Sequence, residues 1–126
     1  MQRWLAGFLA VFNAANGLLM LFAGSFWWAH VAGVGDTGPF NPHFVQDVGA
    51  AFLVSGLALG ARAWREAYWP AAAAGVGFLA VHALIHLAMI ASGHHGHAME
   101  DLFAVIVPAA LAVYAALPSQ GERRYA

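Results

Sequence analysis

The chain has 126 residues, of which 62% are hydrophobic and 9% are charged, and its formal net charge is −1. Soluble domains carry about a quarter charged residues, so this composition indicates a protein embedded in lipid. The near-neutral charge excludes a nucleic-acid-binding protein, which would need a basic surface. The absence of cysteine excludes disulfides and thiolate metal sites.

Four apolar runs predict membrane-spanning helices over residues 4–23, 44–61, 70–91 and 102–117. The first three come close to the roughly 20 residues that a helix needs to cross the hydrocarbon. The fourth run is short and contains Pro108, so we expect it to be kinked or to take in residues at its ends. The expected fold is an all-α, integral membrane four-helix bundle that forms a single domain over residues 1–126.

The first run is expected to stay in the protein as a span rather than act as a cleaved signal peptide. It is longer than a typical signal-peptide core, and Asn13, Asn16 and Gly17 interrupt it. The connection over residues 24–43 is long for a helical hairpin and is expected to be ordered. Its "SFWWAH" stretch predicts an interfacial aromatic belt or a short helix lying on the membrane, and "GVGDTGPFNP" predicts an irregular cap.

The arginines predict the orientation of these spans. All five fall on one side of a four-span arrangement: Arg3, Arg62, Arg65, Arg123 and Arg124. Because arginine-rich segments remain in the cytoplasm, both termini are expected there, in a bacterial-type inner (plasma) membrane. The other two connections contain neither Lys nor Arg and are expected to face outside.

Histidines and an aspartate recur at matching depths near the outer ends of the second and third spans. At a rise of about 1.5 Å per residue, His86 lies about 8 Å below the outer end of its span and Asp47 about 5 Å below that of its own. His82 lies one helical turn below His86, and His43 one turn above Asp47. We therefore expect His86 and Asp47 to meet in one polar site, with His82 below and His43 above.

Three imidazoles and one carboxylate form a ligand set that suits zinc, copper or non-haem iron. The predicted metal ligands are His43, Asp47, His82 and His86, and the predicted cofactor ligands are His82 and His86. Haem b would need axial ligands from two helices, such as His43 with His82 or His86, because residues i and i+4 cannot bind opposite faces of one iron. The amides of Asn13 and Asn16 in the first span would support the site.

Each of these residues also has a structural interpretation. A histidine or asparagine within a span often hydrogen-bonds a neighbouring helix, and Asp47 near a helix start interacts favourably with the helix dipole. An ionisable group inside a span nonetheless indicates a functional site.

The "GHHGH" stretch after the third span contains His94, His95 and His97. At the mouth of the predicted site, these side chains could capture an incoming metal ion. A solvated loop that is rich in histidine explains the same sequence.

Glycines in the second span predict a close helix contact. Gly56 and Gly60 form a GxxxG pair, and Gly49 lies one heptad before Gly56. Such small residues let helix backbones approach closely, either within the chain or between protomers.

The four short spans, the long first outer connection and the polar start of the second span, "NPHFVQDVGAAFLVSGLAL", resemble the small four-helix bacterial membrane proteins of the DoxX-like type. The local likeness is Asp47 with Gly49 at the head of that span. The resemblance implies the four-helix fold. The name-giving members of that type are linked to a quinone-reducing sulfur oxidation complex. The His82/His86 pair and "GHHGH" do not belong to the general family pattern.

Three functions remain open from the sequence. The first is a small inner-membrane protein that binds a transition metal or haem for redox chemistry or metal handling. The second is a non-catalytic accessory subunit of a larger membrane complex, or a homo-oligomer. The third is a quinone-site or proton-relay protein. No serine has an acid–base partner nearby in sequence, so hydrolase chemistry is not expected.

Overall fold

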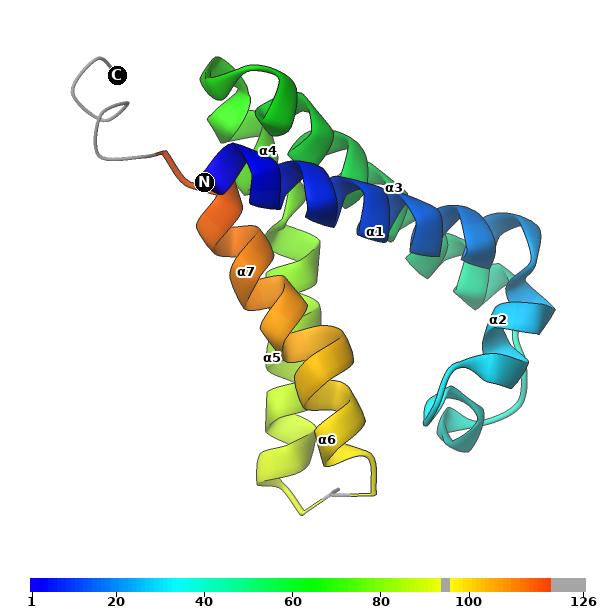
Figure 1. Cartoon of the computed structure of the whole chain (residues 1–126). Coiled ribbons are helices and arrows are strands. Elements are labelled where there is room, and N and C mark those ends of the chain that lie inside the picture. The colour runs from blue at the N-terminus through cyan, green and yellow to red at the C-terminus, as the bar shows by residue number, and fades with distance from the viewer. Residues whose placement is uncertain (94–95, 119–126) are drawn as a thin grey trace.

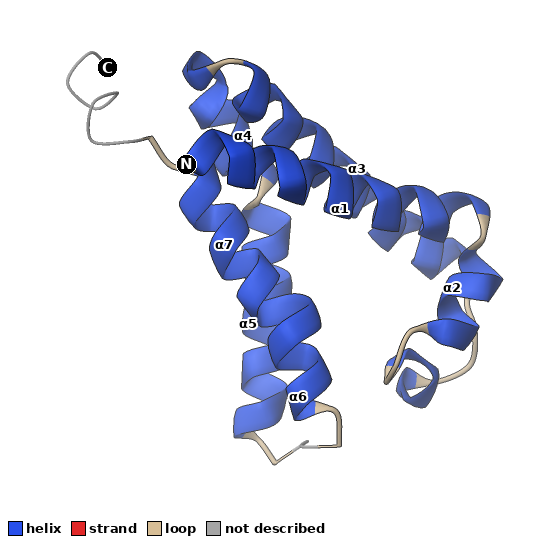
Figure 2. Cartoon of the chain, viewed as in Figure 1, coloured by secondary structure: helices blue, strands red, loops and turns tan. Residues whose placement is uncertain are grey.

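The computed structural model describes residues 1–93 and 96–118, and all regular structure in these residues is helical (Figures 1 and 2). The elements are α1 (Gln2–Phe22), α2 (Gly24–His30), η1 (Val34–Thr37), α3 (Pro42–Trp64), η2 (Glu66–Tyr68), α4 (Trp69–Gly75), α5 (Gly77–Ala91), α6 (Ala98–Asp101), the π-helix η3 (Leu102–Ile106) and α7 (Val107–Ala116). The predicted all-α class is confirmed for this part of the chain.

Three helical stretches are long and apolar enough to cross a membrane: Gln2–Phe22, Pro42–Trp64 and Ala98–Ala116. The bent pair Glu66–Gly75 and Gly77–Ala91 is a fourth candidate. With 21 residues, α1 is about 31 Å long at 1.5 Å per residue, which matches the hydrocarbon thickness. The protein therefore has three to four apolar helices that can span a membrane.

The start of α3 is set by local chemistry. The side chain of Asn41 accepts a hydrogen bond from the backbone N–H of Phe44, at 3.2 Å, and Pro42 occupies the first helical position. Asparagine satisfies an otherwise unpaired N–H at a helix start, and proline costs nothing there because its missing N–H is not needed. The helix thus begins two residues before the predicted run.

The predicted third span, residues 70–91, is two helices with a bend of 41° between them. The break falls between Gly75 and Gly77, and a Cβ added to Gly75 would collide with the side chain of Ala58. The hydroxyl of Ser55 on α3 donates to the carbonyl of Gly75, at 2.8 Å. A serine that binds a carbonyl at a break compensates for the disturbed helical hydrogen bonding.

The fourth stretch runs continuously from Ala98 to Ala116 and contains the π-helix η3. Pro108 has no N–H, and a proline ring crowds the carbonyl four residues before it. The wider turn of η3 ends just before Pro108 and provides the extra space. This stretch begins four residues earlier than predicted, and Asp101 therefore lies inside the helix.

Two antiparallel helix pairs, α1 with α3 and α5 with α7, meet at the end of the molecule where the N-terminus lies (Figure 1). The helices share a core of mostly small side chains there: Ala6, Leu9, Ala10, Leu59, Ala72, Val76, Leu79, Ala83, Ala109, Ala112, Ala115 and Ala116. Arg3, Arg62 and Arg65 lie at this end, which we call the arginine end.

Away from the arginine end, the α1–α3 pair and the α5–α7 pair diverge (Figure 1). The sequence predicted a bundle in which four helices enclose a common interior along their whole length. The four helices instead share an interior only at the arginine end. The physical reason lies in the core: its alanines hold the four helices close at one end, and the 41° bend turns α5 away from the line of α4.

Glycines bring α1 and α3 into close contact. A Cβ added to Gly56 would lie 2.6 Å from the backbone nitrogen of Ala14, and one added to Gly17 would lie 2.6 Å from the carbonyl oxygen of Gly49. One added to Gly60 would lie 3.8 Å from the nearest atom, an ordinary contact. The predicted close packing is confirmed at Gly56 and lies within the chain, whereas Gly60 leaves room for a methyl group.

Candidate functional site

The imidazole of His86 on α5 and the carboxylate of Asp101 on α6 lie in contact. The Nδ1 atom of His86 lies 2.9 Å from Oδ1 of Asp101, and the side chains are only 22% and 21% exposed. The approach is close, but its direction is not that of a hydrogen bond. The contact arises because α5 and the Ala98–Ala116 stretch run antiparallel on either side of a short turn, which brings residues before and after it to the same level.

His82 lies one turn below His86 and extends the pair into the apolar part of the protein. The two imidazole ring centroids are 4.7 Å apart. The ring of His82 also stacks on that of Phe78 in α5, with centroids 5.5 Å apart. The ring of Phe52 from α3 stands nearly perpendicular to it, with centroids 5.9 Å apart. We call His82, His86 and Asp101 the histidine cluster.

The histidine cluster combines groups that exchange protons with groups that exclude water. An imidazole and a carboxylate in contact can pass a proton between them and to a bound ligand. The rings of Phe52 and Phe78 lie against His82 and make the base of the cluster apolar. The side chains of His86 and Asp101 stay partly exposed, although the Nδ1 atom of His86 is itself buried. Ionisable groups placed in this way among apolar helices indicate a functional site.

The predicted contact between His86 and Asp47 is not formed, because each residue has another partner. Asp47 lies 3.4 Å from Nδ1 of His43, and these side chains are 69% and 84% exposed. The divergence of the two helix pairs separates the start of α3 from the end of α5 (Figure 1). The predicted four-residue site is therefore corrected to two separate groups, the exposed pair His43/Asp47 and the histidine cluster.

Metal ligation was the chemistry expected at these residues. Within residues 1–93 and 96–118, no group of three or more His, Cys, Asp or Glu side chains could hold a metal ion. A bound metal or haem stays a prediction of the sequence.

The two asparagines of α1 form hydrogen bonds within α1 and with α2 and do not contact the histidine cluster through these bonds. Asn13 is buried and donates to the carbonyl of Leu9 in the same helix, at 2.7 Å. Asn16 accepts a hydrogen bond from the indole N–H of Trp27, at 2.9 Å. That bond fastens α2 to α1, which confirms a short ordered helix in the "SFWWAH" stretch.

His97, in the segment between α5 and α6, contacts the segment between α2 and α3. Its Nε2 lies 2.7 Å from Oδ2 of Asp36 in η1. Gly33 has a φ of 79° and lies so close that an added Cβ would be 3.0 Å from the imidazole ring of His97. His97 thus has a structural partner, while His94 and His95, predicted with it to capture metal, lie outside the described residues.

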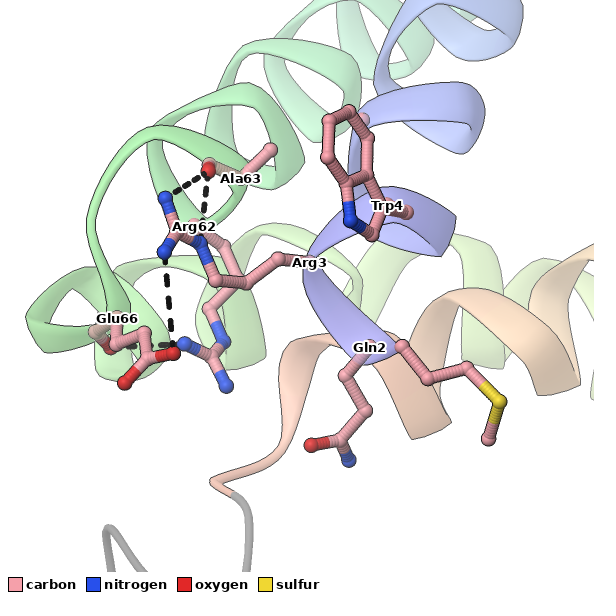
Figure 3. A pocket seen from close by; sticks show the side chains of 8 residues that line it. Gln2, Arg3, Trp4, Arg62, Ala63 and Glu66 are labelled. Carbon is pink, nitrogen blue, oxygen red and sulfur yellow. Dashed lines mark hydrogen bonds and ion pairs between the residues drawn. The ribbon is translucent and has the colours of Figure 1, made fainter.

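The arginine end contains a cavity of about 520 Å³ that the sequence did not predict. Its lining includes the side chains of Arg3, Arg62 and Glu66 (Figure 3). Arg62 is 1% exposed and donates to the carbonyls of Glu66, at 3.1 Å, and Leu117, at 3.5 Å. Its burial has a signal in the sequence: Ser55, Leu59 and Arg62 follow at i, i+4 and i+7 and so share the packed face of α3.

Arg3 reaches from α1 to the end of α3. Its Nε and Nη2 atoms both lie 3.1 Å from the carbonyl oxygen of Ala63, and Nη2 lies 3.0 Å from that of Trp64. Cations favour the carbonyl end of a helix, where these oxygens lack partners within the helix. Arg3 therefore joins the two helices and is held in a defined position beside the cavity.

The chain matches no protein-family model, and comparisons with curated proteins and with solved structures find no match. The resemblance to DoxX-like proteins stays a prediction. The geometry of the histidine cluster and of the arginine end therefore carries the functional argument.

Proposed function

We propose that the protein is a multi-pass protein of a bacterial-type plasma membrane with four spans and with its arginine end in the cytoplasm. The apolar helices support the spans. The position of Arg3, Arg62 and Arg65 at one end supports the orientation, because positively charged segments are retained on the cytoplasmic side. The histidine cluster then lies toward the outer surface.

Cysteine labelling tests this orientation, since the chain has no cysteine of its own. In intact cells, a membrane-impermeant maleimide is expected to label Ser92→Cys but to label Ser119→Cys only after the membrane is opened. Labelling of Ser119→Cys from outside, or of neither position before opening, would contradict the orientation.

We further infer that the histidine cluster binds the head group of a lipid-soluble, proton-coupled carrier of the quinone class. The observation that carries this proposal is the 2.9 Å approach of His86 to Asp101 at the edge of an apolar helix pair. An imidazole N–H can donate a hydrogen bond to a quinone carbonyl. The neighbouring carboxylate can accept a proton from the imidazole or return one to it. The apolar base of the cluster at Phe78 and the lipid around the helices suit a hydrophobic ligand.

Titration of the purified protein with decylubiquinone tests the proposal. The ring nitrogens of His82 and His86 are expected to shift in ¹⁵N NMR spectra as the quinone binds. Asp101→Asn, which preserves side-chain size, and His86→Gln should each raise Kd at least about tenfold, because a charged hydrogen-bonding group contributes on the order of 1.5–3 kcal/mol.

The pair His43/Asp47 provides the matched control, since it has the same chemistry at an exposed position. His43→Gln and Asp47→Asn are expected to leave Kd unchanged. Equal losses in all four variants, or no shift of His82 and His86, would overturn the quinone assignment. Stoichiometric copper, zinc or iron in the purified protein, or a Soret band that His86→Gln removes, would replace it with the metal or haem function.

A further inference from the structure

The cavity at the arginine end brings charged side chains together in a chain that is only 9% charged. Two arginines and one glutamate line it, so its ionisable side chains carry a net positive charge among the described residues. Its volume, about 520 Å³, lies in the range of small-molecule sites. The histidine cluster is built from the other ends of the helices, and nothing in the proposed quinone site uses this cavity.

The guanidinium of Arg3 is both held in place and accessible. Two of its nitrogens bind backbone carbonyls of α3, which fixes the plane of the group. The third nitrogen, Nη1, lies 3.9 Å from Oε1 of Glu66, beyond hydrogen-bond distance, and the Arg3 side chain is 48% exposed. An anion in the cavity can therefore reach Nη1 without displacing the bonds to α3.

The side chains around Arg3 make the cavity suitable for an anionic head group. The buried Arg62 provides a second guanidinium on the α3 side, and the exposed Trp4 stands on the α1 side (Figure 3). Arginine pairs recognise phosphate oxygens by directional, charge-assisted hydrogen bonds, and tryptophan is typical of the membrane–water boundary. Glu66 opposes an anion and limits its affinity.

We propose that this cavity binds a phosphate-bearing anion at Arg3, with the buried Arg62 adding positive charge from the α3 side and Glu66 restraining the affinity. The phosphate can belong to a lipid head group or to a free ion in the adjacent aqueous phase. Both sources present the same phosphate oxygens to the accessible guanidinium of Arg3.

Native mass spectrometry and thermal unfolding of the purified full chain test the proposal and separate the two sources. Phosphatidylglycerol, phosphatidylcholine and inorganic phosphate serve as the probes. If the site binds a lipid head group, the protein retains phosphatidylglycerol in preference to phosphatidylcholine in the mass spectrum, and inorganic phosphate does not change its thermal stability. If the site binds free ions, inorganic phosphate raises the thermal stability of the protein, and the protein shows no preference between the two lipids. Stabilisation by none of the probes would overturn the proposal.

Three variants test which residues determine anion binding. Arg3→Gln is expected to weaken binding of the preferred probe about tenfold, as loss of one charged hydrogen-bonding group predicts. Glu66→Gln removes the opposing carboxylate and should tighten binding several-fold, a gain that misfolding cannot produce. Arg65→Gln is the control: it removes the same charge at the same end, but its guanidinium lies over the Trp64 ring, 4.7 Å from the centroid, and does not line the cavity.

The control also defines how the proposal fails. If Arg65→Gln weakened binding as much as Arg3→Gln, the anion would be attracted by the general charge of the surface and not by a site. A Glu66→Gln variant with unchanged or weaker binding would likewise contradict the role assigned to the cavity.

Discussion

Gly56→Leu is expected to prevent α1 and α3 from packing closely, with a loss of about 3 kcal/mol in the free energy of unfolding. A Cβ alone at this position would lie 2.6 Å from the Ala14 nitrogen and 2.9 Å from the Ala10 carbonyl oxygen. Both are backbone atoms, so no side-chain rotation relieves the overlap, and the helices must separate. Thermal and denaturant unfolding of the purified variant in detergent, followed by circular dichroism, measures the effect.

Gly56→Ala adds only the Cβ that meets the α1 backbone and is expected to be destabilising too. Gly60→Ala is the matched control for it. It lies one helical turn further along α3, where the added methyl group would meet Ala10 at an ordinary distance of 3.8 Å. Because alanine favours helix over glycine by roughly 0.5–1 kcal/mol, Gly60→Ala should be neutral or slightly stabilising. Unchanged stability in Gly56→Ala would show that the helices can move apart at no cost and would contradict the close contact.

Arg62→Ala is expected to lower the free energy of unfolding by about 3 kcal/mol or more, since hydrogen bonds from a charged group contribute roughly 1.5–3 kcal/mol each. The side chain is 1% exposed and binds the carbonyls of Glu66 and Leu117. These bonds connect the end of α3 to η2 and to the end of α7. Their loss leaves both carbonyls without this donor and a void in place of a long buried side chain.

Arg65→Ala is the comparison for this prediction. Arg65 is exposed and contacts the ring of Trp64, so its loss should cost less than about 1 kcal/mol. Both variants are measured in neutral detergent without added lipid or phosphate, which separates folding from anion binding. Equal stability of the two variants would show that the buried position of Arg62 contributes nothing to the fold.

The sequence by itself determined the features that depend on local chemistry. Runs of apolar residues predicted the helical class and the approximate spans, because the length needed to cross hydrocarbon is a property of one segment. Asn41 and Pro42 cap α3 through contacts within four residues. The glycines of the second span predicted a close contact, because absent side chains allow close approach whichever helix fills the space.

Element boundaries were predicted less accurately, because several weak local signals compete there and contacts with other helices decide between them. The bend in the third predicted span depends on Gly75 against Ala58 and on the hydroxyl of Ser55, which come from a different helix. The early start of the fourth stretch at Ala98 moved Asp101 from an expected loop into a helix. The carboxylate of Asp101 is thereby carried on a helix beside α5 and lies 2.9 Å from His86.

Only the tertiary structure decided the partners of the ionisable residues. Spacing along a helix gave Asp47 and His86 similar depths, but depth leaves the position in the plane of the membrane undefined. The alanine core joins the helix pairs at the arginine end and lets them diverge beyond it, so Asp47 meets His43 while His86 meets Asp101. In the same way, Arg62 is buried because three helix ends converge on it, and no pattern within α3 specifies the carbonyl of Leu117.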